Sequence, residues 1–317
     1  MAGGEGMSSS DADGISGIRV GAEVAQALSD RSAVVGLETS VIGQGLPHPR
    51  NVECIGRMAG AIRGADAVPA WVGVLAGEVV VGLSDDELEV FAEPGRAEKV
   101  ARRDLPAACA RGGPGATTVS ATIWAAARAG IRVSATGGIG GVHPGDRPDV
   151  SGDLVELART PGLLVCSGPK SIVDPAATAA RLEELGVSLI GYRVDRLPFF
   201  LTREAPVGLE HRVNTPEEAA AVLAAAMTLD NRSTLLLCCP IGNDVAMDAE
   251  EVAAATRRCQ ERAEREGVRG RDLTPSLLSC LAEETDGRSL TANLALLEGN
   301  ARLGGEVARR FVGRAGV

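Results

Sequence analysis

Short runs of aliphatic and β-branched residues alternate with alanine-rich stretches of helical periodicity along most of this chain. Such runs between helical stretches are typical of strands in an α/β protein. The expected strands are Val34–Leu37, Ala70–Leu75, Glu78–Val81, Arg132–Thr136, Gly162–Ser167, Leu189–Tyr192 and Thr234–Cys239, and the expected helices are Val20–Leu28, Val52–Arg63, Asp85–Phe91 (capped by Ser84), Val119–Arg128, Leu154–Arg159, Pro175–Leu185, Pro216–Met227, Asp248–Glu266 and Leu290–Arg310. Strands separated by helices predict an α/β layered fold.

The chain is long enough for one large core. It has 317 residues, of which 45% are hydrophobic. Residues 1–18 are mostly Gly, Ser, Ala and Asp without periodicity, and we predict a disordered tail there. No internal repeat, linker or domain boundary follows, so we expect a single domain over residues 19–317.

Composition excludes several classes of protein. Aromatic residues make up 2% of the chain, which argues against a stacking surface for a nucleic acid strand. The net charge of −10 argues against a polyanion-binding protein but leaves room for a local anion site. No membrane span and no signal peptide are expected, which favours a cytoplasmic protein. The seven scattered cysteines are expected to be buried or incidental thiols in a reducing cytoplasm, forming neither a disulfide framework nor a zinc site.

Lysine is scarce in this chain. Of the 32 basic residues, only Lys99 and Lys170 are lysines, and the other 30 are arginines. A solvated surface position accepts either residue, but an amine that must lose its proton cannot be an arginine. Lys170 follows the apolar run Leu163–Cys166, and strand ends are where sites form in α/β sheets. An amine partly buried there would have a lowered pKa and could act as a nucleophile.

Two glycine-containing segments follow expected strands. Gly137–His143 lacks the third glycine of a dinucleotide-binding fingerprint, so a tight turn and a ligand-binding loop both stay open. Gly168–Ser171 looks like the end of a phosphate-binding loop, but Pro169 stands where that loop needs a glycine and has no N–H to offer.

Carboxylates and hydroxyls mark three further candidates. The segment Asp149–Asp153 suits Mg²⁺ or Mn²⁺, or a phosphate at a helix N-terminus, although an ordinary helix cap explains it equally. The segment Thr117–Thr122 suits a sugar phosphate or, again, a cap. Glu38 closes an apolar strand and is a candidate general acid, with a solvated loop carboxylate as the alternative.

Taken together, these segments resemble one family. The matching segments are Leu37–Ile42, Pro47–Glu53, Lys99–Pro106, Ala116–Val119, Thr136–His143, Asp149–Leu154, Gly168–Ile172 and Ser289–Asn293. The chain resembles the pseudouridine-5′-phosphate glycosidases, also called indigoidine synthase A-like proteins, from about Val20 to Phe311. The resemblance implies a three-layer α/β/α domain with a central mixed sheet, a homotrimer, and an enzyme that uses Mn²⁺ or Mg²⁺.

The resemblance also implies roles for individual residues. Lys170 would be the nucleophile, Glu38 the proton donor and Asp149 the metal-linked residue. The implied substrate contacts are Lys99 (phosphate), Thr118, Val119, His143, Ser151, Gly152, Asp153 and Asn293. Both lysines of the chain fall on positions with an implied function.

The implied chemistry makes or breaks the carbon–carbon bond between C1 of ribose 5-phosphate and an aromatic partner through a Schiff base on Lys170. Cys238-Cys239-Pro240 departs from the Ala-Asn-Pro that the family often has, and a lost amide weakens recognition of uracil. We therefore favour the branch that attaches ribose 5-phosphate to aromatic polyketides, as in alnumycin biosynthesis. Cleavage of pseudouridine 5′-phosphate is the first alternative, and a non-catalytic nucleotide-binding protein is the second.

Overall fold

A computed structural model describes residues 17–145 and 149–314 of the chain. The disordered tail predicted for residues 1–18 therefore lies almost entirely outside the described residues. Ile18 already belongs to the first strand, β1 (Ile18–Val20). No helix in these two ranges is long and apolar enough to cross a membrane.

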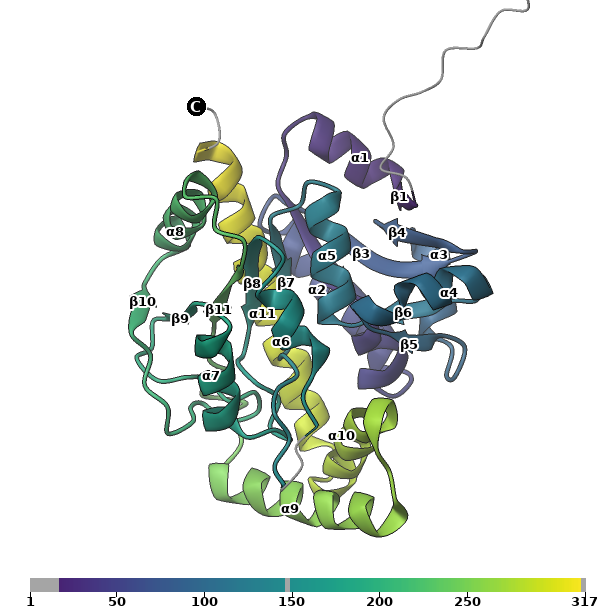
Figure 1. The fold of residues 1–317 in the computed structure, drawn as a ribbon, viewed down its shortest axis with the longest axis vertical. Coiled ribbons are helices and arrows are strands. Elements are labelled where there is room, and N and C mark those ends of the chain that lie inside the picture. Colours follow the sequence, from purple (N-terminus) through teal and green to yellow (C-terminus); the bar gives the residue numbers. More distant parts are fainter. Residues whose placement is uncertain (1–16, 146–148, 315–317) are drawn as a thin grey trace, which may run out of the picture.

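One mixed sheet forms the centre of the molecule (Figure 1). Its strands lie in the order β1-β4-β3-β2-β7-β8-β11-β9-β10, and β6 pairs with both β3 and β5. The remaining bounds are β2 (Val34–Glu38), β3 (Val68–Leu75), β4 (Glu78–Val81), β5 (Glu98–Val100), β6 (Gly115–Thr117), β7 (Val133–Ala135), β8 (Gly162–Cys166), β9 (Leu189–Tyr192), β10 (His211–Val213) and β11 (Thr234–Cys238). All pairs are parallel except those of β4 and β6 with β3.

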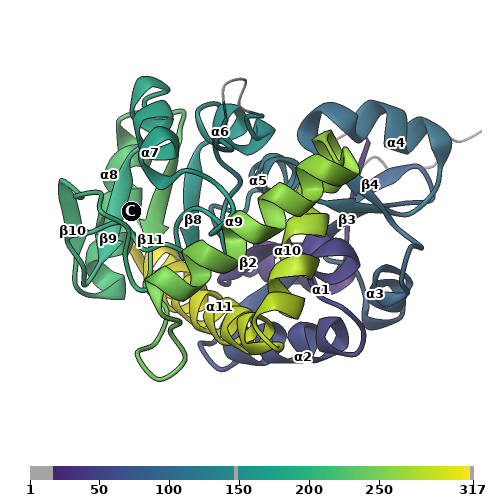
Figure 2. The same ribbon diagram turned by 90° about the horizontal axis from the view of Figure 1, so that it is seen from below.

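Helices cover both faces of the sheet, so the predicted three-layer α/β/α fold is confirmed (Figures 1 and 2). One face carries α2 (Arg50–Arg63), α3 (Asp85–Ala92), α8 (Pro216–Thr228) and α11 (Arg288–Arg314). The other carries α1 (Ala22–Ser29), α4 (Leu105–Arg111), α5 (Val119–Arg128), α6 (Gly152–Leu157) and α7 (Pro175–Glu184).

Alternating side chains along the central strands explain the two helical layers. Leu163 and Val165 of β8 join the core beneath α11, whereas Leu164 and Cys166 join the core beneath α5, α6 and α7. Because successive strand residues point to opposite faces, a strand covered on both sides is apolar throughout. All five residues of β8 are buried.

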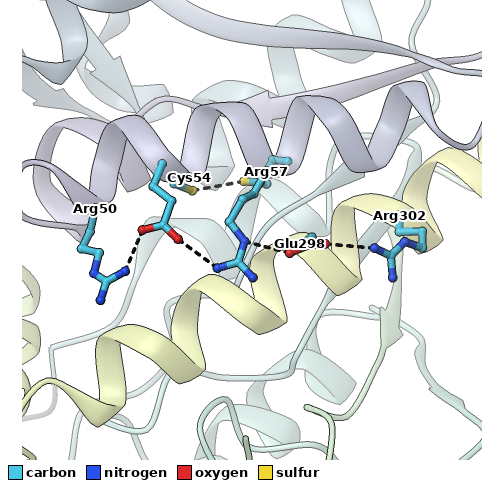
Figure 3. A network of polar contacts seen from close by, with 7 residues as sticks. Arg50, Cys54, Arg57, Glu298 and Arg302 are labelled. Atoms are coloured by element: carbon cyan, nitrogen blue, oxygen red, sulfur yellow. Dashed lines mark hydrogen bonds and ion pairs between the residues drawn. The ribbon is translucent and has the colours of Figure 1, made fainter.

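The helices α2 and α11 are joined by a chain of charged side chains (Figure 3). Glu53 accepts hydrogen bonds from Arg50 and Arg57, and Arg57 donates to Glu298 of α11 over 2.8 Å. Arg302 donates to the same Glu298 over 2.9 Å. These exposed pairs add little stability individually, and the pair of Arg57 with Glu298 is the one that crosses from α2 to α11.

Helices α9 (Ala249–Glu266) and α10 (Leu273–Glu284) lie across one end of the sheet, at the bottom of Figure 1 and in front in Figure 2. A disulfide joins Cys259 of α9 to Cys280 of α10. The expectation that every cysteine is a free thiol was therefore wrong for this pair. The two cysteines are 21 residues apart in the sequence, and the packing of α9 against α10 brings them together. The other five cysteines are free.

Candidate active site

A cavity lies at the end of the sheet where β2, β7 and β8 finish, on the side that α9 and α10 occupy in Figures 1 and 2. Its walls come from the residues that follow these strands, from the segment 149–153 and from Asn293 of α11. Thr274, Pro275 and Leu278 of α10 close it from outside. Parallel strands end at one edge of a sheet, which is why residues distant in sequence meet here.

Glu38, the last residue of β2, faces this cavity and is 4% exposed. Its two carboxyl oxygens each accept a hydroxyl hydrogen bond, one from Ser40 over 2.6 Å and one from Thr136 after β7. Hydroxyl groups can both donate and accept, so the same pair can hold the protonated and the ionised carboxyl group. Glu38 is thus a buried, oriented carboxyl group and not a solvated loop residue.

Both lysines of the chain line the cavity. Lys99 belongs to β5 and Lys170 follows β8, so two different parts of the sheet supply the two amines. Burial lowers the pKa of Lys99 from its usual 10.5, and the positive charge of Lys170 lowers it further, while Asp153, Glu38 and Asp272 oppose the shift. The effect of the Lys170 charge on Lys99 places the two amines within electrostatic range of each other.

The glycine-rich segment 137–143 is a wall of the cavity, not merely a turn. A Cβ atom on Gly138 would lie 2.8 Å from the Phe200 ring, and one on Gly140 would lie 2.3 Å from the Ser151 hydroxyl oxygen. Only glycine lets the main chain pass so close to these side chains. The segment therefore brings backbone atoms to the cavity surface.

Asp153 lines the cavity, but its carboxylate is already engaged. One oxygen accepts the N–H of Ser120 at 3.0 Å, and the other accepts the N–H of Gly140 at 3.1 Å. The carboxylate thus caps the first turn of α5 and holds the glycine segment in place. Ser151 accepts the N–H of Asp153 at 3.2 Å and caps α6.

The remaining predicted contacts divide into two groups. His143, Asp149, Gly152, Thr118 and Asn293 line the cavity. Val119 does not: its side chain is 2% exposed and packs in the core beneath α5 and α6. The Asn293 side-chain oxygen is buried and has no hydrogen-bond partner among the described residues.

Known proteins match this chain over nearly its whole length. The sequence pattern of the indigoidine synthase A like proteins matches residues 23–310. Pseudouridine-5′-phosphate glycosidase of Saccharopolyspora erythraea is 44% identical over 93% of this chain and 98% of its own. The enzyme of that name from Symbiobacterium thermophilum is also 44% identical, over 90% of this chain and 95% of its own.

Solved structures agree in fold. The prealnumycin C-glycosynthase AlnA, determined in complex with ribulose 5-phosphate, has a TM-score of 0.86 and 38% identity over 94% of this chain and 98% of its own. The indigoidine synthase A-like protein of Thermotoga maritima has a TM-score of 0.85 and 38% identity over 93% of this chain and 96% of its own. The chain belongs to the indigoidine synthase A like family. The family and the kind of enzyme predicted from the sequence are confirmed.

The resemblance to this family implies a divalent metal ion, and the side chains near Asp149 limit how such an ion could be held. Among the described residues, no three His, Cys, Asp or Glu side chains gather closely enough to hold an ion. Asp149 lines the cavity, whereas both oxygens of Asp153 accept main-chain hydrogen bonds. One free carboxylate fits Mg²⁺ or Mn²⁺ that keeps most of its water and is held partly by the substrate.

His143 lies beside Asp149: the main-chain N–H of His143 donates a hydrogen bond to the main-chain carbonyl of Asp149 over 2.9 Å. Burial lowers the pKa of His143 below its usual 6.5. The charge of Asp149 opposes this shift, while Lys99 and Lys170 reinforce it. His143 is therefore neutral at pH 7, and its ring can both donate and accept a hydrogen bond.

Sequence reasoning missed several residues of this family member's site. Thr136 orients Glu38, and Thr274, Pro275 and Leu278 of α10 close the cavity. Thr136 was noted as the end of an expected strand and as the start of a matching segment, but no role was given to it. The residues of α10 carry no local signal of a site, because their role depends on how α10 packs over the sheet.

Cys238 and Cys239 are not part of the cavity wall. Cys238 is fully buried beneath α5, α6 and α7, and the Cys239 side chain packs against the core on the α11 side. Burial raises the pKa of the Cys239 thiol to about 12. The substitution at Cys239 therefore changes packing behind the site, and the idea that it removes a group that contacts uracil has no support in this structure.

Proposed function

We propose that this protein cleaves pseudouridine 5′-phosphate to uracil and ribose 5-phosphate, through a Schiff base on Lys170. One observation carries the proposal: the two lysines of the chain and the buried carboxyl group of Glu38 surround one cavity. Relatives named for this reaction are 44% identical over more than nine-tenths of their length. A non-catalytic nucleotide-binding protein would have no use for two amines beside an oriented carboxyl group.

Glu38 and Lys170 supply the bond-breaking steps. Glu38 donates its proton to the ribose ring oxygen as the bond from that oxygen to C1 breaks. The Lys170 amine adds to C1 and loses a proton. The bond from C1 to the uracil carbon then breaks as that carbon takes up a proton, which leaves a Schiff base on Lys170. Water hydrolyses the Schiff base, releases ribose 5-phosphate and regenerates the amine.

Lys99 holds the phosphate in this proposal. Its ammonium group is a compact charge, which suits a phosphate that is bound but does not react. Lys99 and Lys170 line the same cavity, so one sugar phosphate could contact both amines, with its phosphate at Lys99 and C1 at Lys170. A bound phosphate dianion would offset the repulsion between the lysines.

Asn293 and His143 fit the base. The unpaired oxygen of Asn293 is an acceptor that lacks a donor, and a buried acceptor without a partner costs about 1–3 kcal/mol. Uracil carries N–H donors that would satisfy it, and neutral His143 can bond a uracil carbonyl or N–H. Asp149 would hold Mg²⁺ or Mn²⁺ with its water shell, and the bound ion would supply positive charge near the substrate oxygens.

Attachment of ribose 5-phosphate to an aromatic polyketide is the second candidate. It is favoured by the 38% identity and TM-score of 0.86 to the prealnumycin C-glycosynthase, which was determined with a pentose phosphate bound. Glu38, Lys170 and Lys99 would play the same parts in reverse. The two functions differ in the direction of the reaction and in the aromatic partner, and the polar acceptor at Asn293 favours uracil.

Offering pseudouridine 5′-phosphate with Mn²⁺ to the protein tests the proposal. Saturable release of free uracil supports it. Absence of uracil, together with a borohydride-trapped adduct of ribose 5-phosphate on Lys170, would replace uracil by another aromatic partner. Absence of both would leave a binding protein. Sedimentation of the same sample tests the homotrimer that the resemblance implies.

A further inference from the structure

A second hollow, separate from the catalytic cavity, lies between the short helix η2 (Arg102–Asp104), α5 and α6. We call it the arginine groove. Five arginines line it, against one acidic side chain, Glu156; the arginines are Arg102, Arg103, Arg128, Arg132 and Arg159. In a chain of net charge −10, this concentration of positive charge is unusual, because such charges repel one another.

Most of these arginines have no acidic partner. Among the described residues, sixteen arginines have an acidic side chain within 4.0 Å, and Arg103 is one of them, at 3.7 Å from Asp104. In the part of the chain that the structure describes, Arg102, Arg128, Arg132 and Arg159 have none. Glu156 accepts a hydrogen bond from Thr160 over 2.6 Å. Most of the positive charge of the groove is thus not compensated by acidic side chains of the described residues.

Trp124 gives the groove its form. The guanidinium carbon of Arg102 lies 4.1 Å from the centre of the indole ring, and that of Arg128 lies 5.0 Å from it. A guanidinium that stacks on an aromatic ring keeps its N–H groups free at its edge. The stacked arginines are therefore held in place and present a fork of donors to the groove, as recognition of a phosphate requires.

We propose that the arginine groove binds a small anion that carries at least two phosphate groups. One phosphate carries at most about two negative charges at pH 7 and leaves most of the five guanidinium charges uncompensated, whereas a second phosphate group adds both charge and acceptor oxygens. A nucleic acid strand fits poorly, because the Trp124 ring supports arginines instead of a base and the rest of the chain is acidic. Ala101, Arg103 and Gly152 line both hollows, so the bound anion would lie beside the catalytic cavity.

The two tryptophans of the chain make binding measurable. Trp71 is 2% exposed and its N–H has no hydrogen-bond partner among the described residues, so Trp71→Phe removes no such bond. In that variant, Trp124 in the groove is the only source of tryptophan fluorescence. We would titrate inorganic pyrophosphate in the presence of saturating ribose 5-phosphate, which occupies the catalytic cavity. Calorimetry on the unaltered protein checks the affinity independently.

We expect a saturable change in fluorescence with one pyrophosphate per chain, weaker binding of orthophosphate, and loss of affinity at high salt. Arg128→Ala and Arg159→Ala should each weaken pyrophosphate binding about tenfold, the effect of one charged hydrogen bond. The matched control is Arg309→Ala: Arg309 lines another surface hollow in which Asp30, Asp66 and Glu217 also lie, and its loss should leave binding unchanged.

Three results would overturn the proposal. The first is no saturation by either method. The second is equal weakening by Arg309→Ala, which indicates general attraction of anions. The third is that the unaltered protein binds no pyrophosphate while Arg128→Ala changes the oligomeric state. That result would assign the groove to contact with a second copy of the chain.

Discussion

Asn300 of α11 donates a hydrogen bond from its side-chain amide to the main-chain carbonyl of Thr136 over 2.8 Å. Thr136 in turn donates its hydroxyl to Glu38. The same Asn300 amide donates to the hydroxyl of Ser167 at 3.0 Å, on the segment that leads from β8 to Lys170. One buried side chain therefore ties together the strand ends that carry the proposed acid and the proposed nucleophile.

We predict that Asn300→Asp lowers kcat about 10²-fold and changes KM little, because a small displacement of reacting groups costs about that much. The variant keeps the shape of the side chain but loses the donors. Asn231→Asp is the control, since the Asn231 amide also donates to a carbonyl, that of Ser233, and does not line the cavity. Equal loss of thermal stability in both variants with unchanged kcat in Asn300→Asp would reduce Asn300 to a structural role.

The local elements were the easiest part of the structure to predict. The helix expected at Val119–Arg128 has those bounds, and Ser84 caps α3 in a capping box with Glu87. Strands β1, β5, β6 and β10 were missed, because each has three residues and exists only through pairing with another segment of the chain. A periodic pattern cannot be recognised in so short a segment.

Sequence reasoning found the site residues that lie at the end of an apolar strand or shortly after it. Glu38 and Lys170 do so, and the scarcity of lysine drew attention to Lys99. Asn300 was missed because its contacts depend on the register of a helix laid across the sheet, and no local pattern encodes that register. The closure of the cavity by α10 was missed for the same reason.

Replacement of the proposed nucleophile gives the sharpest test of the chemistry. Lys170→Arg should abolish turnover and leave folding intact, because an arginine keeps its proton and forms no Schiff base. Lys99→Arg should keep the trapped adduct and raise KM. Borohydride reduction with ribose 5-phosphate, followed by peptide mass mapping, locates the adduct in each variant, and initial rates of uracil release give turnover and KM. An adduct on Lys99 in place of Lys170 would contradict the assignment.

The affinity for the phosphate should depend on pH through Lys99. Its pKa is lowered from 10.5, mainly by burial, so the ammonium charge is lost at a lower pH than for an ordinary lysine. KM for the phosphorylated substrate should therefore rise with pH, about tenfold per unit once Lys99 is mostly neutral. Lys99→Arg should abolish the rise, because arginine stays charged. A KM that rises equally in the variant would assign the effect to another group.

The disulfide between Cys259 and Cys280 should stabilise the segment that closes the cavity. It spans 21 residues, and a loop of that length gives about 3 kcal/mol of stabilisation by restricting the unfolded chain. Denaturant unfolding of Cys280→Ser should show about that loss, and reduction of the unaltered protein should reproduce it. Cys109→Ser, at a free cysteine of α4, is the control and should change little.

Metal dependence should pass through Asp149. Asp149 is a cavity-lining carboxylate of the segment 149–153. The other carboxylate of this segment, Asp153, already accepts hydrogen bonds from main-chain N–H groups. Removal of the Asp149 carboxylate should therefore remove the protein's main contact with a hydrated cation. We expect chelation to abolish uracil release from pseudouridine 5′-phosphate and Mn²⁺ or Mg²⁺ to restore it, with Zn²⁺ a poorer substitute for this oxygen-rich site.

Asp149→Asn should need more than about tenfold higher Mn²⁺ for half-maximal rate, the cost of one charged contact. Glu156→Gln, at an acidic side chain outside the cavity, should keep the Mn²⁺ requirement of the unaltered protein. Full activity after exhaustive chelation would show that the protein works without a metal, and an unchanged Mn²⁺ requirement in Asp149→Asn would move the cation to other ligands.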